Sequence, residues 1–219
     1  MTPSTEERWY PNKITAGEFG GKYNRPTVEF LLSDDNELHA KPKDQLQIAE
    51  LGIWKGATSY QFAMFLEGQG KLHLFDYEDN VATVATALKA EGFSNVVTWG
   101  SSYKYLDSYN WALMKILREH PEPVFDYVYL DGAHTWAIDA LAFCLCDRLL
   151  KPLGYIAFDD YEWRLRGSSV DPSRVRETGL LYTEEQIGEK QVKLIVDLLV
   201  RRNSNYHEIV PQRIFQKMA

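Results

Sequence analysis

The sequence of 219 residues lacks most features that mark membrane and secreted proteins. It has no run of 18 or more apolar residues, the length a helix needs to cross a bilayer, so no membrane partner is predicted. Its first residues lack the basic and apolar regions of a signal peptide. Cysteine is nearly absent: Cys144 and Cys146 lie two positions apart in a helical-looking run, where their side chains point to different faces and are not expected to form a disulfide. We therefore expect both to be small core residues of a cytoplasmic protein.

Positive charge is also scarce, with 24 Lys and Arg against 31 Asp and Glu and a net charge of −7 at pH 7. Proteins that bind nucleic acid usually present a basic face that releases phosphate counterions, so nucleic acid is not an expected partner. The chain has no internal repeat or low-complexity tract. Hydrophobic residues make up 45% of it and aromatic residues 13%, enough for the sizeable core of one domain.

Short apolar runs of strand length alternate with segments of helical length. The expected strands are residues 46–51, 72–75, 96–99, 127–130 and 155–158. The expected helices are residues 57–67, 79–90, 102–119 and 134–150. Because this alternation is typical of right-handed βαβ units, it predicts an α/β fold with a parallel sheet that is covered on both faces.

The beginning of the chain differs from this pattern. Residues 1–24 are polar and contain several glycines, and we expect them to form an arm or lid. The apolar run 28–32 predicts a short leading helix. The expected organisation is therefore an N-terminal segment, residues 1–45, followed by one domain over residues 46–219.

The last third of the chain also departs from simple alternation. Residues 161–185 form a long connection with Gly, Ser, Pro and four arginines, which suits either a solvated surface loop or a contact with substrate. An amphipathic helix is expected over residues 186–201. Residues 206–210 and 213–217 predict two antiparallel strands joined by a tight turn.

The turn after the first expected strand reads Glu-Leu-Gly-Ile-Trp-Lys-Gly over residues 50–56. Gly52 and Gly56 permit close backbone approach and unusual dihedral angles where a strand turns into a helix. A dinucleotide-binding fingerprint would have glycine where Trp54 stands, and a phosphate-cradling loop would have Ser or Thr after Lys55. The turn therefore favours a ligand that places no phosphates there.

Two acidic residues end the first two strands and suit such a ligand. Glu50 is placed to accept a hydrogen bond from an ammonium group, or to hold the loop through its backbone N–H groups. Asp76 follows the second strand, where an acid can accept both hydroxyls of a ribose. The alternative is structural: the glycines only turn the chain and Asp76 only caps the next helix.

Three further acids end the fourth and fifth strands. Asp131 follows one and Asp159-Asp160 the other; because these strands are neighbours in such a sheet, ~4.8 Å apart, the carboxylates converge at one rim. They would raise one another's pKa unless a cation lay among them, and all-oxygen ligands suit Mg²⁺. His134 is placed as a general base for a hydroxyl whose pKa the metal lowers. Alternatively, Asp131 or His134 caps the following helix, and Asp159-Asp160 are solvated loop acids.

These motifs together resemble a known family. Glu50-x-Gly52-x-x-x-Gly56 with Asp76 is similar to motif I and the ribose-binding acid of class I S-adenosylmethionine-dependent methyltransferases. The stretches 125–134 (FDYVYLDGAH) and 150–161 (LKPLGYIAFDDY) look like the branch that contains the metal-dependent macrolide-sugar O-methyltransferases, and more distantly like the catechol-type enzymes. The resemblance covers roughly residues 46–162.

The resemblance implies a Rossmann-like, doubly wound, seven-stranded sheet of order 3-2-1-4-5-7-6 with strand 7 antiparallel. It implies S-adenosylmethionine as cofactor, a divalent metal such as Mg²⁺, and His134 and Asp131 as catalytic residues. Where the family often has an acidic or polar residue near the adenine, after strand 3, this chain has Gly100-Ser101-Ser102. The implied metal ligands are Asp131, Asp159 and Asp160. The implied cofactor-binding residues are Glu50, Gly52, Gly56, Asp76, Ser101 and Asp131.

The resulting hypothesis is an O-methyltransferase that acts on a hydroxyl of a small acceptor, a sugar or a phenol of secondary metabolism. Three alternatives stay open: a metal-independent N- or carboxyl-methyltransferase, a nicotinamide-dependent oxidoreductase, and a non-catalytic member that binds a ligand or partner. The oligomeric state is open too, with a homo-oligomer among the possibilities. Trp54 opposes the oxidoreductase, since a fingerprint glycine would be needed there.

Overall fold

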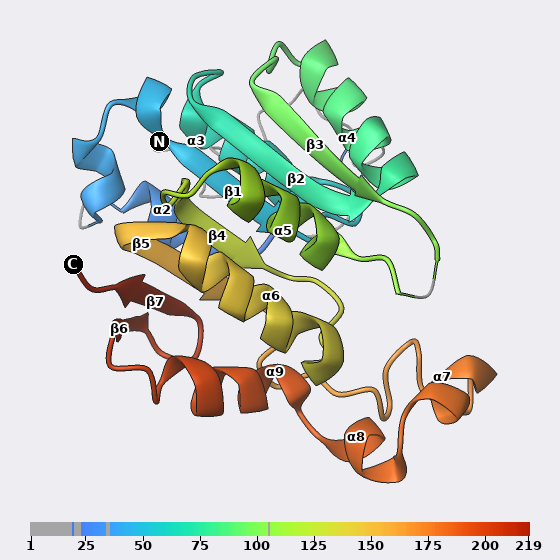
Figure 1. Ribbon diagram of the computed structural model, residues 1–219. Helices are drawn as coiled ribbons and strands as arrows, with labels where there is room; N and C mark the ends of the chain where they lie inside the picture. The colour runs from blue at the N-terminus through green and yellow to red at the C-terminus, as the bar shows by residue number, and fades with distance from the viewer. Residues whose placement is uncertain (1–18, 20–22, 34–35, 105) are drawn as a thin grey trace, which may run out of the picture.

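The computed structural model describes residues 19, 23–33, 36–104 and 106–219, and its centre is a seven-stranded sheet with helices on both faces (Figure 1). The strand order is β3-β2-β1-β4-β5-β7-β6, and β7 runs antiparallel to both β5 and β6. The predicted order and the antiparallel seventh strand are thus confirmed. The strands are β1 (Gln47–Leu51), β2 (Lys71–Tyr77), β3 (Val96–Ser101), β4 (Phe125–Leu130), β5 (Leu150–Phe158), β6 (Tyr206–Val210) and β7 (Ile214–Lys217).

The helices divide into two layers that cover the two faces of this sheet. Helices α2, α3 and α4 contribute to one apolar cluster, which includes Leu31, Phe62 and Leu88. Helices α5, α6 and α9 contribute to the other, which includes Leu113 and Ile195. β4 is buried along its whole length, as its apolar run requires. The helices are α2 (Arg25–Leu32), α3 (Ala57–Leu66), α4 (Glu78–Ala90), α5 (Tyr109–Glu119), α6 (Trp136–Leu149), α7 (Arg176–Leu181), α8 (Glu184–Gly188) and α9 (Gln191–Ile195).

Helix α5 begins later than the sequence predicts, at Tyr109 and not at residue 102. The hydroxyl of Ser108 caps it by accepting from the N–H of Asn110 at 3.3 Å. Asp107 accepts from the backbone N–H of Ser102 at 2.8 Å and from its hydroxyl at 2.7 Å. These short polar side chains compete with helical hydrogen bonding, which is why the helix starts only after them.

The expected helix over residues 186–201 is in fact two helices and a π-helical turn. α8 starts with a capping box between Thr183 and Gln186 and ends at Gly188. α9 follows and continues into the π-helix η3 (Val196–Val200). The connection over residues 161–185 also contains a short helix, α7, that the sequence did not predict. In Figure 1, α7 and α8 project beyond the lower right edge of the sheet.

The described part of the N-terminal segment packs against the sheet. It contains α2 and two 3₁₀ turns, η1 (Glu37–Ala40) and η2 (Lys43–Gln45), and α2 is the leading helix that the sequence predicts. The side chain of Lys41 donates to the buried carboxylate of Asp126 on β4 at 2.9 Å. The predicted arm or lid falls largely on residues 1–18 and 20–22, which lie outside the described residues.

Both cysteines lie on α6 and are free, as predicted, but only Cys146 belongs to the core. Cys144 is exposed, so the expectation of two core cysteines is wrong for that residue. The two positions fall on different helix faces, and one of these faces solvent. In the described part of the chain, every helix is too short or too polar to traverse a bilayer.

Candidate active site

The turn between β1 and α3 brings the chain against the end of β4. Gly52 has φ +83°, and a Cβ atom there would lie 1.9 Å from the carbonyl oxygen of Asp131. Only glycine fits a position that is both left-handed and this close to neighbouring backbone. Trp54, also left-handed at φ +41°, leaves 66% of its side chain exposed. Gly56 has φ +79°, and a Cβ there would crowd Val84 of α4.

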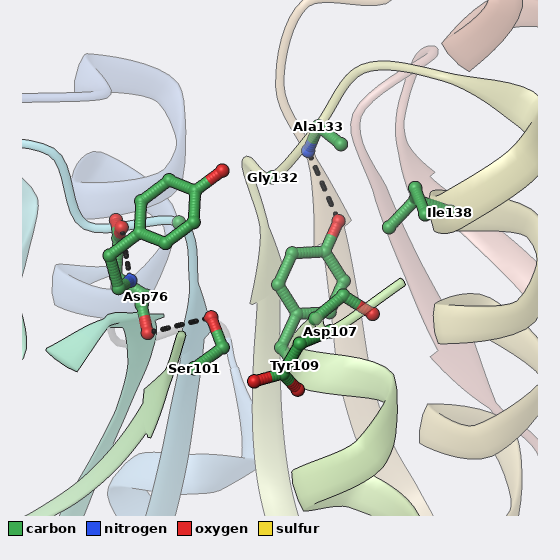
Figure 2. Close-up of a pocket in the computed structure, with 10 residues that line it drawn as sticks. Asp76, Ser101, Asp107, Tyr109, Gly132, Ala133 and Ile138 are labelled. Atoms are coloured by element: carbon green, nitrogen blue, oxygen red, sulfur yellow. Dashed lines mark hydrogen bonds between the residues drawn. The ribbon is translucent and has the colours of Figure 1, made fainter. Parts of the chain in front are cut away.

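Two adjoining cavities lie over the carboxyl ends of the central strands. The Tyr109 cavity, about 300 Å³, is bordered by Ser101, Asp107 and Tyr109 (Figure 2). The Asp131 cavity, about 480 Å³, is bordered by Glu50, Trp54, Asp131, His134, Asp159 and Asp160. Both cavities share Gly52, Asp76, Tyr77 and Gly132 along their boundary. They therefore form one elongated cleft at the edge where α/β sheets bind ligands.

Glu50 is a buried acid at the floor of the Asp131 cavity, and only 1% of it is exposed. Burial raises its pKa well above the usual range; the charges of Asp131 and Asp76 add to this, against a hydrogen bond from Ser59. Its Oε2 atom has no hydrogen-bond partner among the described residues. A buried acceptor without a partner is costly, so it suits a ligand that brings a donor, such as an ammonium group.

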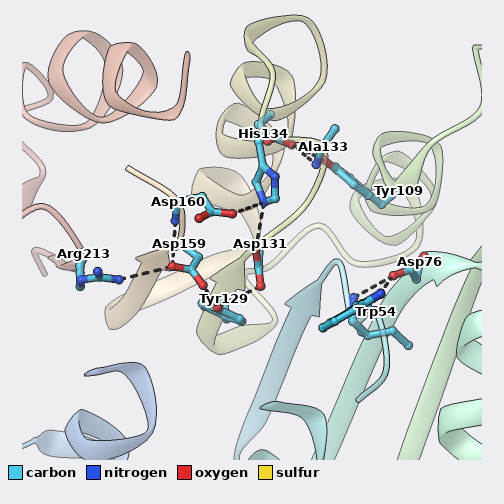
Figure 3. Close-up of polar contacts among 12 residues, drawn as sticks. Trp54, Asp76, Tyr109, Tyr129, Asp131, Ala133, His134, Asp159, Asp160 and Arg213 are labelled. Atoms are coloured by element: carbon cyan, nitrogen blue, oxygen red, sulfur yellow. Dashed lines mark hydrogen bonds and ion pairs between the residues drawn. The ribbon is translucent and has the colours of Figure 1, made fainter. Parts of the chain in front are cut away.

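Asp76, the predicted ribose-binding acid, ties the β1–α3 turn to the end of β2. Its Oδ2 accepts from the N–H of Ile53 at 2.8 Å and from that of Trp54 at 3.2 Å (Figure 3). Its Oδ1 accepts from the N–H of Tyr77 at 2.6 Å and from the side chain of Asn80 at 2.9 Å. The carboxylate borders both cavities while it holds the turn.

Asp131, His134 and Asp160 meet in the Asp131 cavity (Figure 3). Nε2 of His134 lies 3.0 Å from Oδ1 of Asp131 and 3.3 Å from Oδ2 of Asp160. One ligand atom from each of the three residues lies within 4.8 Å of the others. This spacing would let one cation contact all three groups.

Asp159, the third predicted metal ligand, turns toward other partners. Its Oδ2 accepts from the hydroxyl of Tyr129 at 2.8 Å. Its Oδ1 accepts from the backbone N–H of Asp160 at 2.8 Å and from Arg213 at 3.3 Å. Burial opposes ionisation, but these hydrogen bonds, one from Asn24 and the charge of Arg213 lower the pKa of Asp159 below its usual range.

The acids of this cluster differ from ordinary surface carboxylates. Burial raises the pKa of Asp131 to about 6; a hydrogen bond with His134 opposes this rise, and the charge of Asp159 adds to it. Burial also raises the pKa of Asp160, against the charge of His134. Burial alone would lower the pKa of His134, but its hydrogen bond to Asp131 and the neighbouring acids outweigh burial and raise it.

Most of the predicted site residues lie together. Glu50, Gly52, Asp76, Asp131, His134, Asp159 and Asp160 border the Asp131 cavity, and Ser101 borders the Tyr109 cavity. Gly56 borders neither cavity and serves the turn. The capping alternative is wrong for Asp131 and His134, because the N-cap of α6 is Thr135.

Sequence reasoning missed Tyr109, which borders the cleft, and three residues that bond to its lining: Tyr129 and Arg213, which bond Asp159, and Asp139, which bonds Tyr109. Tyr129 and Asp139 lie within apolar runs of β4 and α6, where a buried hydroxyl and a buried acid were the only signals. Nothing in the local sequence points to Tyr109, at the start of α5, or to Arg213, in the turn between β6 and β7.

A family model described as a methyltransferase domain matches residues 49–161, just over half of the 219 residues. No curated protein matches the chain. Several solved structures share its fold at low sequence identity. An O-methyltransferase from Bacillus cereus in complex with S-adenosylhomocysteine (SAH) has a TM-score of 0.60 and 16% identity, covering 100% of this chain and 92% of that one.

Two further structures come from biosynthetic pathways. TomG from Streptomyces achromogenes, involved in tomaymycin synthesis and bound to S-adenosylmethionine (SAM), has a TM-score of 0.56 and 19% identity over 90% of this chain and 81% of that one. MycE of the mycinamycin pathway, bound to Mg and SAH, has a TM-score of 0.52 and 15% identity over 89% of this chain and 49% of that one. At these identities, the likeness shows the fold.

Proposed function

Since the chain belongs to the methyltransferase domain family, we propose that it transfers the methyl group of SAM to a hydroxyl oxygen of a small acceptor. The observation that carries this proposal is the elongated cleft. At its floor, Glu50 has a buried oxygen without a partner among the described residues, and Asp131, His134 and Asp160 face the same cavity. The cleft thus offers room for a nucleoside beside a cluster of acid and base groups.

The cofactor is proposed to lie along both cavities. Glu50 would accept from the ammonium group of the methionine part, and the Gly52 turn would let that part approach the backbone. Asp76 would meet the ribose where the cavities join, and Ser101 would border the adenosyl end in the Tyr109 cavity. This orientation directs the methyl group toward the acid cluster.

The donor set of the cluster fits a divalent cation. Asp131 and Asp160 each supply a carboxylate oxygen, and these oxygens lie within 4.8 Å of each other. Burial and the charge of Asp159 raise the pKa of Asp131, so its ionised form is disfavoured until a cation offsets that cost. Asp131 and Asp160 would hold Mg²⁺. Asp159 would become a further ligand if it gave up its hydrogen bond from Arg213 or Tyr129 and bound the ion instead. When bound, such a cation lowers the pKa of an acceptor hydroxyl and fixes its position.

His134 is proposed as the general base. Its imidazole takes the proton of the acceptor hydroxyl, and Asp131 and Asp160 stabilise the resulting imidazolium. The acceptor oxygen forms a bond with the methyl carbon as the bond between that carbon and sulfur breaks, which releases SAH. Because the reaction is an in-line displacement, holding the acceptor and SAM in contact supplies much of the rate.

A metal-independent reaction is the second candidate, and one observation favours it. Nε2 of His134 lies within hydrogen-bond distance of both Asp131 and Asp160, an arrangement that makes the imidazole more basic without a cation. Such a base suffices for an acceptor more acidic than an ordinary hydroxyl.

Methyl transfer to a panel of sugars, phenols and carboxylic acids tests these proposals. SAH release should require a hydroxylated acceptor and fall at least a hundredfold with Asp131→Ala or with exhaustive chelation, and Mg²⁺ should restore the chelated enzyme. Asp44→Ala, an exposed acid before β1, is the matched control and should retain full activity. Full activity after chelation would contradict the metal role. If no acceptor in the panel supported release of SAH, the proposed function would be contradicted.

A further inference from the structure

We infer that Tyr109 and Asp139 form a positioning pair that holds the backbone of residues 132–134 and so fixes His134 beside the acids. The inference rests on the proposed function only in the role it gives to His134. Neither residue belongs to the acid cluster: Tyr109 begins α5 and Asp139 lies in the first turn of α6. They are positioning residues, because they act on the reaction through His134.

The pair is buried between two helices. Asp139 is fully buried and Tyr109 is only 8% exposed. The hydroxyl of Tyr109 donates to Oδ1 of Asp139. It also accepts from the backbone N–H of Ala133 at 3.1 Å (Figure 2). The backbone N–H groups of Ala133 and His134 also bond to Asp139. One buried pair thus binds two consecutive amides immediately before α6.

The local sequence does not hold this turn by itself. His134 has φ +56°, a left-handed conformation that costs a residue with a Cβ atom some energy. Thr135, the N-cap of α6, makes no capping hydrogen bond, and its Oγ1 has no partner among the described residues. Helices need their first amides satisfied by capping or tertiary contacts. Tyr109 and Asp139 satisfy the amides just before the helix, so they also hold the unfavourable backbone of His134.

Gly132 shows how closely the turn fits the tyrosine. A Cβ at Gly132 would lie 2.3 Å from the hydroxyl oxygen of Tyr109. The turn therefore approaches Tyr109 to a distance that only glycine permits. Residues 131–134 run over the tyrosine hydroxyl and then direct His134 back toward Asp131 (Figure 3).

Tyr109 also borders the cavity proposed for the adenosyl end of the cofactor (Figure 2). Its ring faces that cavity, while its hydroxyl holds the His134 turn. Replacing Tyr109 by Phe therefore keeps the ring that lines the cavity and removes only the contact between the hydroxyl and the turn.

The test compares Tyr109→Phe, which removes only the hydroxyl, with a matched control. The control is Tyr206→Phe. The hydroxyl of Tyr206 donates to Asp147 at 2.8 Å, and Asp147 lies near the C-terminal end of α6, far from the His134 turn. Tyr109→Phe should speed hydrogen exchange at the amides of residues 133 and 134 by about fivefold or more, as loss of one hydrogen bond predicts. It should also shift the ¹⁵N resonances of the His134 imidazole, and Tyr206→Phe should change neither.

Kinetics supply the second measurement. Tyr109→Phe and Asp139→Ala should lower kcat about tenfold or more, because the base is misplaced, while the Kd of SAH changes by less than about threefold. Asp139→Asn keeps an acceptor oxygen for the amides and should recover part of the loss. Recovery by Asn, but not by Ala, distinguishes positioning from general destabilisation.

Unchanged amide exchange and unchanged His134 resonances in Tyr109→Phe would overturn the inference, whatever happens to kcat. The same effect from Tyr206→Phe would overturn it as well, since the change would then reflect loss of stability. Neither spectroscopic readout needs turnover. If both respond as expected but the wild-type protein transfers no methyl group, the positioning pair stands and the proposed function fails.

Discussion

At the scale of single residues, the surroundings of Asp131 have a marked effect on the pKa of its carboxyl group. Its pKa of about 6 lies above that of an ordinary aspartate because the group is buried, and the charge of Asp159 adds to the effect against the hydrogen bond with His134. A group whose pKa is raised by folding lends stability at low pH and withdraws it as the pH rises through the folded value. The acid cluster therefore stores a cost that a bound cation would offset.

Replacing Asp131 by Asn should stabilise the metal-free protein at pH 8. At that pH the wild-type carboxylate is forced to ionise, whereas the amide is neutral. The gain should shrink or reverse at pH 5, below the folded pKa, where wild-type Asp131 binds its proton. Thermal unfolding in chelator at both pH values measures this. A lower Tm for Asp131→Asn at pH 8 would contradict it.

His134 should titrate above its ordinary value of 6.5 in the metal-free protein, since Asp131 and Asp160 favour its charged form over the opposing effect of burial. Addition of Mg²⁺ should lower that pKa, because a cation replaces the proton between the same groups. Imidazole NMR of the protein, with and without Mg²⁺, measures both. A pKa for His134 below 6.5 without metal would show that burial dominates.

At the scale of secondary-structure elements, the cleft depends on how closely the ends of β1 and β4 approach each other. The N–H of Gly52 bonds the carbonyl of Phe75 on β2 at 2.8 Å, and the N–H of Asp131 bonds the carbonyl of Leu51 at 2.8 Å. These backbone hydrogen bonds hold the end of β1 and the turn after it against both neighbouring strands. Side chains from several strand ends therefore lie close together in the cleft.

Gly52→Ala should abolish SAH binding and lower stability by several kcal/mol, because the new methyl group meets the Asp131 carbonyl and the left-handed backbone is strained. Gly68→Ala is the matched control: Gly68 also has a positive φ, +73°, but a Cβ there meets nothing within 4 Å. Its cost should be about 1 kcal/mol, with SAH affinity unchanged. SAH affinity is measured by calorimetry and stability by thermal unfolding. If Gly52→Ala and Gly68→Ala had equal effects, the close approach of Gly52 to the Asp131 carbonyl would have no role.

The sequence predicted those elements whose apolar pattern reflects burial alone. β1 and β4 read as apolar runs because helices cover both faces of the sheet at these central strands. The predicted helix began too early, at residue 102, because the residue pattern there is compatible with a helix. In the structure the Ser108 side chain caps α5, so the helix begins only at Tyr109. The turn into the π-helix after α9 was missed because i→i+5 bonding leaves no mark in an amphipathic pattern.

The same limit applies to the candidate site. Asp131, His134 and Asp160 follow strand ends, so the order of the strands predicts that they meet. The position of Asp159, turned toward Tyr129 and Arg213, depends on side chains from other elements. Contacts of that kind are set by tertiary packing, and periodicity carries no information about them.

At the scale of the whole molecule, the acids proposed for function and the buried acid Asp126 lie at opposite ends of the strands. Asp131 follows the carboxyl end of β4, whereas Asp126 lies near its amino end. Asp126 is 2% exposed, and it joins Lys41 of the N-terminal segment to Lys151 of β5 at 2.9 and 2.8 Å. It also accepts from the N–H of Gln47 at 3.0 Å. These contacts make the described part of the N-terminal segment an integral layer of the domain.

Asp126→Asn should therefore lower the free energy of unfolding by ~1–3 kcal/mol, since one buried acceptor and the charge of its two ion pairs are lost. The affinity for SAH should not change, because the cleft lies at the other end of the strands. Glu119→Gln is the control: its pair with Arg118 is exposed, at 3.9 Å, and contributes little. Chemical denaturation and calorimetry check both variants, and a loss of SAH affinity in Asp126→Asn would contradict the separation.

Calorimetric titration of the purified protein with SAH, beside an identical titration with NAD, tests the central claim most directly. The account predicts one SAH per chain, no measurable binding of NAD, and at least tenfold weaker SAH binding in Glu50→Ala, which removes the buried acceptor at the cavity floor. Absence of SAH binding, or tight binding of NAD in its place, would contradict it.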